Sequence, residues 1–347
     1  MKNLTELHLS KTVNTPPTRE NLPIAPMQLK IFYYVQNMLS DISDFTNDTT
    51  GPQTSNLIEL HLEDNKIDEI YYLHLQGLDS LEKLFLCRNN IRFIDNGAFY
   101  ILEKLNYVYL DGNPLLQLEH MSLWSDSIQF MSLANTGLFL EPQYSSKNPL
   151  NFNNSISSLD LSGTNLNTHL LNGFAKYYQS LRSLNVSQNS LDTLASETFH
   201  KLLSLEELWL TNNSLTHISD SSLPPELWRQ LKTLDLSGNP FRCDCSLFKF
   251  SQWIKTNNFS YSTKLLNNMQ CVSYLNEKKQ SFIVSKTENR LKMKCLVEEN
   301  EWFLWALTAT VSVISCLSTF ASAVHRFRWN IRYWLFTHKV SLISTFA

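Results

Sequence analysis

The chain has 347 residues, with 29 Lys or Arg against 32 Asp or Glu, and a formal net charge of −3. This balance lacks the excess of basic residues with which proteins neutralise nucleic-acid phosphates, so nucleic acid is not a favoured partner. Because 43% of the residues are hydrophobic and 12% are aromatic, the chain can build a large core, which excludes a wholly disordered protein.

A leucine-rich pattern repeats along residues 1–241. The pattern L-x-x-L-x-L-x-x-N-x-L, the signature of the leucine-rich repeat, is complete at 57–67 and again at 81–91. We therefore predict an α/β fold of about ten stacked repeats, a leucine-rich-repeat solenoid or horseshoe with short parallel strands on its concave face. Further copies start at Leu105, Ile128, Ile156, Leu181, Leu205 and Leu231, and looser copies start at Leu4 and Leu29.

Each repeat also predicts which side chains are buried. Side chains alternate along a short strand, so Leu60 and Leu62 are expected to point inward, with their neighbours facing the concave side. The Asn at the ninth position turns the chain, and we expect its amide to bond backbone groups of adjacent coils. It recurs at Asn37, Asn65, Asn89, Asn113, Asn189, Asn213 and Asn239, and Thr replaces it at Thr12, Thr136 and Thr164.

Aromatic and acidic side chains gather at concave positions in the first half of the array. Aromatic side chains beside carboxylates favour the binding of a protein or a cationic ligand. The alternative is that these strands contain aromatic residues for their sheet propensity alone. Our candidate ligand-binding residues are Tyr33, Glu59, His61, Phe85, Tyr107, Tyr109 and Asp111, and Glu63 lies beside them. Later repeats have mainly Ser, Asp and Asn at these positions, with one exposed aromatic at Trp209.

A cysteine-rich segment at 242–296 follows the repeats. Its cysteines are Cys243, Cys245, Cys271 and Cys295. We expect a C-terminal cap stapled by disulfides. Four cysteines allow three pairings, and because a Cys243–Cys245 bond would close a very tight ring, two alternatives remain. A zinc site is the competing interpretation. It is disfavoured because an extracellular position favours oxidation and no His completes a zinc-binding spacing.

Residues 302–324 form an apolar stretch without a charge, long enough as a helix to cross about 30 Å of hydrocarbon. We predict a single transmembrane helix in contact with lipid, with a buried core helix as the alternative. The preceding flank is acidic, whereas the tail at 325–347 begins with basic residues, and such basic flanks stay in the cytoplasm. The repeats are therefore expected on the extracellular or lumenal side, with a short cytoplasmic tail.

Six N-x-S/T sequons occur, all on the side expected to be extracellular. Asn185 lies on an expected concave strand, where a glycan would obstruct that face, so we predict weaker occupancy there. The candidate glycosylation sites are Asn3, Asn47, Asn153, Asn185, Asn212 and Asn258.

Motifs typical of enzymes are absent from the sequence. It contains no H-E-x-x-H, G-x-S-x-G, G-x-x-x-x-G-K or G-x-G-x-x-G string, and with 8 Gly residues a loop that holds phosphate is not favoured. We therefore predict a binding protein and not an enzyme, with no catalytic residues, no cofactor and no metal site.

The order of parts in the chain resembles a Toll or Toll-like receptor of innate immunity. The resemblance rests on the repeats, the cysteine cap, the apolar span and the segment RFRWNIRYWLF at 326–336. It implies the disulfides Cys243–Cys271 and Cys245–Cys295 in the cap. It also implies a single-pass pattern-recognition receptor whose repeats bind a protein or microbial ligand. Such a receptor forms a homodimer, or a heterodimer with another Toll-like receptor, to signal.

The sequence departs from that pattern at both ends. Only about 23 residues follow the span, whereas a cytoplasmic TIR domain needs more than about 100. Neither a signal peptide nor an N-terminal cap precedes the first repeat. We therefore expect a fragment of a receptor. The alternatives are a transmembrane adhesion protein with leucine-rich repeats and a decoy receptor that cannot signal.

Overall fold

The computed structural model describes residues 4–11, 29–43, 56–118, 121–138, 155–175, 177–194, 196–275 and 278–343. The chain forms two compact units, Met1–Glu288 and Asn289–Ala347. The repeats and the elements that follow them lie in the first unit, and most of the long C-terminal helix makes up the second.

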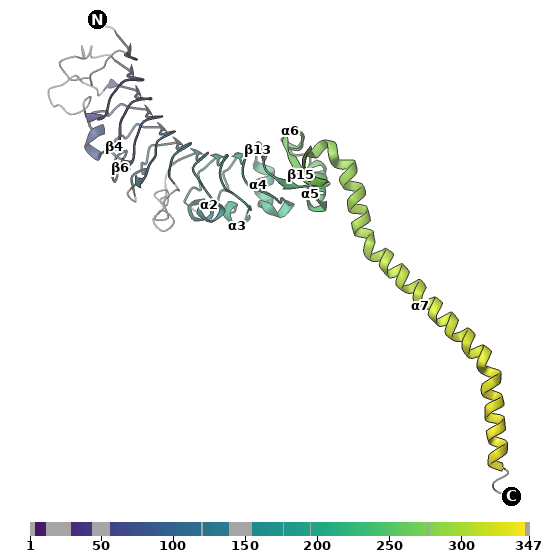
Figure 1. Cartoon of the computed structure of the whole chain (residues 1–347). Helices are drawn as coiled ribbons and strands as arrows, with labels where there is room; N and C mark the ends of the chain where they lie inside the picture. The colour runs from purple at the N-terminus through teal and green to yellow at the C-terminus, as the bar shows by residue number, and fades with distance from the viewer. Residues whose placement is uncertain are drawn as a thin grey trace. The chain divides into compact units, whose positions relative to one another are not determined.

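One continuous parallel sheet runs through the described coils, with one three-residue strand from each coil (Figure 1). Neighbouring strands pair in register, so equivalent residues of successive coils lie side by side. This sheet confirms the predicted leucine-rich-repeat solenoid. In spatial order its strands are β1 (Glu6–His8), β2 (Ile31–Tyr33), β3 (Glu59–His61), β5 (Lys83–Phe85), β7 (Tyr107–Tyr109), β9 (Phe130–Ser132), β10 (Ser158–Asp160), β11 (Ser183–Asn185), β12 (Glu207–Trp209) and β13 (Thr233–Asp235).

The middle residue of most strands is buried, as the alternation of the repeat predicts. Leu60, Leu84 and Leu208 are fully or almost fully buried, while the residues on either side of them are partly exposed. A single coil cannot bury its own leucines, because each needs the coils on both sides. The apolar side chains of the first unit accordingly form one core cluster that extends along the whole stack.

The predicted asparagine ladder joins each coil that has the Asn to the coil before it. In Asn65, Nδ2 donates to the carbonyl of Tyr34 at 2.6 Å, and Oδ1 accepts from the backbone N–H groups of Asn37 and Leu39, each at 3.2 Å. Where Thr replaces Asn, the bond changes: the Thr164 hydroxyl donates to a carbonyl of its own coil. Thr12, another of these replacements, lies outside the described residues.

Short elements that the leucine pattern does not specify form the convex side. In the early coils the strands β4 (Glu69–Ile70), β6 (Phe93–Ile94) and β8 (Gln117–Leu118) pair as a second parallel sheet, beside the 3-10 helix η2 (Tyr72–Leu75). Helices are described on this side of the later coils. They are α2 (Thr168–Ala175), α3 (Ser196–Phe199), the 3-10 helix η4 (Asp220–Ser222) and α4 (Pro225–Gln230).

The cysteine-rich segment folds as a cap beside the last coil. Its elements are β14 (Phe241–Arg242), α5 (Cys245–Asn257), α6 (Ser262–Asn268), β15 (Gln270–Leu275) and β16 (Lys278–Ile283). A disulfide joins Cys243 to Cys271, which is the pairing that the family resemblance implies. Cys245 and Cys295 are disulfide-bonded as well. Four cysteines held in disulfides leave no thiolate ligands for zinc, so this competing interpretation fails.

One long helix, α7 (Val284–Ile343), follows the cap in the described part of the chain. Within it, Trp305–His338 is long and apolar enough to cross a membrane, with a mean hydropathy of 1.7 in its most apolar stretch. The predicted span at 302–324 is therefore the middle of a longer helix, which continues through most of the predicted tail. One candidate membrane span in the described part of the chain agrees with the sequence prediction.

Candidate functional site

A stack of aromatic rings crosses the concave face of the first coils. Its members are the third residues of five neighbouring strands, which the parallel register brings into line. Ring centroids lie 4.0 Å apart from His8 to Tyr33, from Tyr33 to His61 and from His61 to Phe85, and 4.5 Å apart from Phe85 to Tyr109. We call these five residues the ring stack.

The ring stack ends at strand β9, whose third residue is not aromatic. Strand β9 has Ser132 at its third position, and its aromatic residue, Phe130, is at the first position. The ring of Phe130 is tilted against Tyr109 and against Tyr107, with centroids 4.9 and 5.9 Å away. The structure therefore brings all the aromatic candidates into one contiguous group on β2, β3, β5 and β7.

Stacking decides which part of these rings a ligand can reach. Within the ring stack the neighbouring rings cover each other's faces, so the edges and hydroxyl groups remain for contact. Tyr107 differs, because it is 38% exposed and the Nζ of Lys83 lies 5.8 Å from its ring centroid. The face of Tyr107 thus already has a cation beside it.

Two carboxylates flank the imidazole of His61. Its Nδ1 lies 3.2 Å from Oε1 of Glu63, and its Nε2 lies 3.7 Å from Oε2 of Glu59. Within the described part of the chain, Nε2 of His61 and Oε2 of Glu63 are buried and make no hydrogen bond. An unsatisfied buried polar atom costs about 1–3 kcal/mol of folding stability.

The carboxylates near His61 interact with side chains of the adjacent strands. Lys83 donates to Glu59 at 2.9 Å, and this hydrogen bond raises the pKa of Lys83. Burial raises the pKa of Tyr33, and the nearby carboxylates of Glu6, Glu59 and Glu63 raise it further. The concave face around β2, β3 and β5 therefore combines aromatic rings with a local excess of negative charge.

Asp111 has a different environment from the other candidates. Its Oδ1 accepts from the hydroxyl of Ser132 and from the backbone N–H of Ala134, the latter at 3.1 Å, and its Oδ2 accepts from Sγ of Cys87 at 3.1 Å. Burial, followed by this bond, raises the pKa of Cys87 to about 12. The carboxylate of Asp111 is engaged within the fold, so its contacts support the strands.

The sequon residues have unequal environments. Asn185 donates to Oδ2 of Asp160 at 2.8 Å and accepts from the backbone N–H of Ser187 at 3.1 Å, so both ends of its amide are occupied. Asn212 and Asn258 are exposed. Asn3, Asn47 and Asn153 lie outside the described residues. The weaker occupancy expected at Asn185 stays a prediction.

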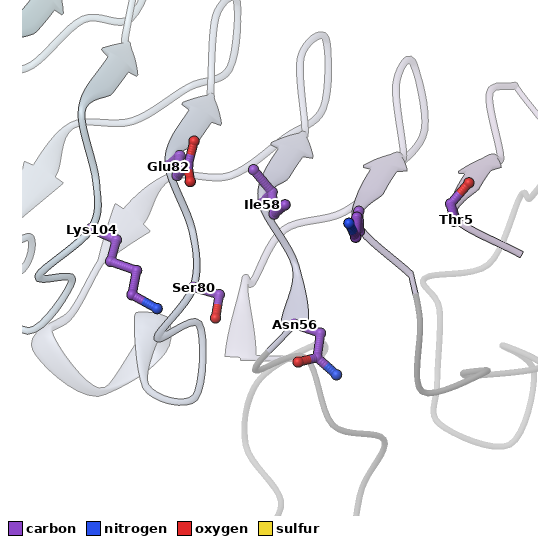
Figure 2. A pocket seen from close by; sticks show the side chains of 7 residues that line it. Thr5, Asn56, Ile58, Ser80, Glu82 and Lys104 are labelled. Atoms are coloured by element: carbon purple, nitrogen blue, oxygen red, sulfur yellow. The ribbon is translucent and has the colours of Figure 1, made fainter. Parts of the chain in front are cut away.

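A cavity of about 630 Å³ opens along the edge at which the strands begin (Figure 2). Charged and small polar side chains dominate its lining, and they come from the first five coils. In later coils the same edge has its charges paired, with Glu206 held between Arg182 and Lys232. The lining residues are Thr5, Lys30, Asn56, Ile58, Ser80, Glu82 and Lys104.

A second hollow, of about 610 Å³, lies on the turns that lead from the convex side back to the strands. Its aromatic residues are Tyr72 and Tyr100, which are 40% and 49% exposed. The sequence prediction missed it, because its residues come from three successive coils at positions outside the repeat signature. We call it the aromatic groove, and it is lined by Tyr72, Tyr100, Ile101, Glu103, Ser125, Asp126 and Ser127.

A family model described as leucine rich repeat matches residues 55–115 and 179–241. Both stretches contain strands of the long parallel sheet. This match and the solenoid fold agree that the chain contains stacked leucine-rich repeats.

Curated relatives include proteins of two kinds. The chain is 29% identical over 212 residues to transforming growth factor beta activator LRRC33 of Danio rerio, a match that covers 58% of this chain and 25% of that protein. It is 26% identical over 198 residues to Toll-like receptor 2 of Pan troglodytes, covering 56% and 23%. The chain thus spans about a quarter of the length of these relatives.

Among solved structures, the crystal structure of human 5T4 (Wnt-activated inhibitory factor 1, trophoblast glycoprotein) is similar, with a TM-score of 0.53 and 21% sequence identity. The match covers 68% of this chain and 86% of that one. At this level of identity the likeness concerns the fold.

Proposed function

We propose that this leucine-rich-repeat chain is the recognition and membrane-anchoring part of a Toll-like receptor. In this proposal the repeats lie outside the cell or in a lumen, α7 crosses the membrane, and ligand binding promotes association with a second receptor chain. Similarity to Toll-like receptor 2 supports the proposal, as do the solenoid, the cap disulfides and the apolar helix.

The observation that carries the ligand-binding role is the ring stack beside the carboxylates of Glu59 and Glu63. The ring stack supplies a rigid surface of ring edges and hydroxyl groups. The carboxylates add negative charge beside it, which favours a protein or ligand with a positive group. We infer that the ligand contacts Tyr33, Glu59, His61 and Phe85, with Tyr107 and Tyr109 at the far end of the contact.

Effective concentration explains how association with a second chain would produce a signal. Two weakly interacting cytoplasmic partners held on one membrane-bound assembly reach an effective concentration in the millimolar range. A ligand that brings two chains together therefore triggers signalling without changing the affinity of the partners themselves. A chain of this kind without a signalling partner acts as a decoy, and one that binds a neighbouring cell acts in adhesion.

Co-precipitation with Toll-like receptor 2 tests this proposal. The full chain and full-length Toll-like receptor 2, each with its own tag, are expressed together, and the surface complexes are isolated with and without heat-killed bacteria. We expect Toll-like receptor 2 to co-precipitate, with at least a threefold increase after bacteria are added. Replacing both Tyr107 and Tyr109 by Ala should remove the increase.

A variant on the later coils provides the control. Ser183→Ala lies on the same concave sheet at β11, away from the ring stack, and should keep the increase in co-precipitation. Absence of Toll-like receptor 2 from the precipitate under both conditions would refute a shared complex and favour the adhesion role. An increase that survives the double Ala replacement would place the ligand elsewhere on the solenoid.

A further inference from the structure

We propose that the aromatic groove binds an arginine-bearing segment of a protein partner, with the guanidinium group on the tyrosine rings and paired with Glu103 and Asp126. The residues of the groove lie on the turns after β4, β6 and β8, outside the concave sheet. It is thus an interaction surface separate from the ring stack, and it goes beyond the proposed function.

Exposed apolar area is the first argument. Tyr72 and Tyr100 line the groove, and the adjacent Tyr71 and Leu73 are 41% and 56% exposed. Isolated exposed apolar residues are ordinary, but a group of large ones around a hollow marks a site of interaction. Tyrosine is also among the residues most enriched at the energetic centres of interfaces.

The ring of Tyr100 is held in place before any partner arrives. Trp124, one coil further on, stacks on it with centroids 4.6 Å apart and ring planes inclined by 11°. Trp124 is itself half-buried and packs against the core. Because the ring is already ordered, binding to it costs little side-chain entropy, which favours affinity.

Charge decides which partner fits. The two residues in the lining that are charged at neutral pH are Glu103 and Asp126, so the described lining has acidic and no basic side chains. The adjoining surface is acidic as well: the Tyr71 hydroxyl donates to Glu69 at 2.6 Å, and Oδ2 of Asp95 accepts from the Tyr72 N–H at 3.3 Å. The Glu69 hydrogen bond, burial and the nearby carboxylates raise the pKa of Tyr71.

Arginine satisfies this combination better than lysine. Its guanidinium group is planar, so it stacks on an aromatic face while its N–H groups bond a carboxylate in pairs. A lysine ammonium provides the same charge without the flat face. Tyr72 and Tyr100 therefore favour an arginine side chain, and Glu103 and Asp126 complete its coordination.

Peptide binding to the full chain in lipid nanodiscs tests the proposal. The probe is a fluorescent peptide, acetyl-Gly-Arg-Leu-Arg-Gly-amide, compared with analogues that have Lys or uncharged citrulline in place of Arg. We expect the Arg peptide to bind with the lowest Kd, the Lys peptide more weakly, and the citrulline peptide at least about tenfold more weakly than the Arg peptide.

Variants assign the binding to the groove. Tyr100→Ala, and separately the double variant Glu103→Gln with Asp126→Asn, should each raise Kd at least about tenfold, whereas Tyr100→Phe keeps the ring and should preserve binding. Matched controls on later coils are Leu203→Ala, an exposed apolar residue, and Glu197→Gln, an exposed acid. Both should leave Kd unchanged.

Three results would overturn the proposal. One is no binding of the Arg peptide at millimolar concentration, and another is equal binding of the citrulline analogue. The third is a Kd that rises with Glu59→Gln on the concave face while the groove variants leave it unchanged. Because this assay needs neither bacteria nor Toll-like receptor 2, its failure is distinguishable from failure of the proposed function.

Discussion

The side chain of Arg88 reaches back across one coil and forms a two-pronged ion pair with Asp64. Its Nε lies 2.7 Å from Oδ1, and its Nη2 lies 2.8 Å from Oδ2. The two residues occupy the same turn position in successive coils, 24 residues apart, and both have left-handed backbone, with φ of 54° and 57°. A turn that is repeated in register thus places opposite charges side by side.

Acid should weaken this pair in a defined pH range. The hydrogen bond from Arg88 lowers the pKa of Asp64, so the pair stabilises the fold above the ordinary carboxyl pKa of about 3.9 and loses this contribution as the pH falls through the lowered value. We expect Asp64→Asn to lower stability at pH 7 by less than about 1 kcal/mol, because both side chains are partly exposed. Below pH 4 the difference from the unaltered chain should shrink, which thermal unfolding of both chains at pH 7 and pH 3 will measure. A difference that grows on acidification would contradict this reading.

The left-handed turn position that Arg88 and Asp64 occupy predicts opposite effects for two substitutions in other coils. Gly163 has φ of 66°, and an added Cβ would lie 2.5 Å from Oδ1 of Asn135, so Gly163→Ala should cost about 1–2 kcal/mol. Gln188 holds the equivalent position with φ of 56°, and Gln188→Gly should relieve left-handed strain and raise stability by a few tenths of a kcal/mol. Denaturant unfolding of both variants checks the pair. Equal effects of the same sign would show that the turn geometry is not the cause.

Asn189 should be among the most costly ladder positions to replace. Its Oδ1 accepts from the N–H groups of Thr164 and Leu166 at 3.0 and 2.9 Å, and its Nδ2 donates to the carbonyl of Leu161 at 2.8 Å. Asn189→Ala leaves these buried groups unsatisfied, and we expect a loss of about 2–4 kcal/mol in unfolding free energy. Asn96→Ala, at an exposed position, is the control and should change it by less than about 0.5 kcal/mol.

Cys87 should react with thiol reagents far more slowly in the folded chain than in the unfolded chain. Its pKa of about 12 leaves about one thiol in 10⁴ ionised at pH 8, whereas a free cysteine with a pKa near 8.5 is about one quarter ionised. Iodoacetamide labelling followed by peptide mass spectrometry, with and without denaturant, measures the ratio. We expect at least a hundredfold slower labelling when the chain is folded. Asp111→Asn should speed the reaction by removing the charge next to Sγ.

The strands and their buried residues could be predicted from the sequence because they depend on local order. Leu60 and Leu62 are two residues apart, and strand geometry alone turns them to the same side. The ladder at Asn65 is equally local in origin, since a buried amide at a fixed place in each coil must find the backbone of its neighbours. A period near 24 residues then repeats these features along the chain.

The packing of the concave side chains depends on the exact alignment of neighbouring strands, which the repeat pattern alone does not reveal. Tyr33, His61 and Phe85 were identified as candidates, but the covering of one ring face by the next follows from the exact alignment of three-residue strands. The internal role of Asp111 likewise depends on Ser132 and Cys87 in the adjacent coils. The ligand-contact residues therefore remain a hypothesis that the sequence raised and the geometry made more specific.

The aromatic groove was missed because its residues follow no pattern shared between coils. Tyr72 belongs to a 3-10 helix, Tyr100 to a turn after β6, and Asp126 to the turn after β8. On the convex side, the segment between two strands can differ from coil to coil, because the core requires only one or two apolar side chains from it, such as Phe99. Surfaces formed by these convex segments can therefore be recognised only in a structure.

The cap holds the last coil of the parallel sheet by bonds that the repeats do not have, and this sets how that end of the solenoid responds to force. The coil of β13 adjoins a cap in which Cys243 is bonded to Cys271 and the Tyr261 hydroxyl is bonded to the Trp228 carbonyl at 2.7 Å. A pulling force or a local fluctuation should therefore separate coils that are joined by strand pairing and the asparagine ladder alone before it opens β13 and the cap. The capped coil would be the last of the described repeats to unfold.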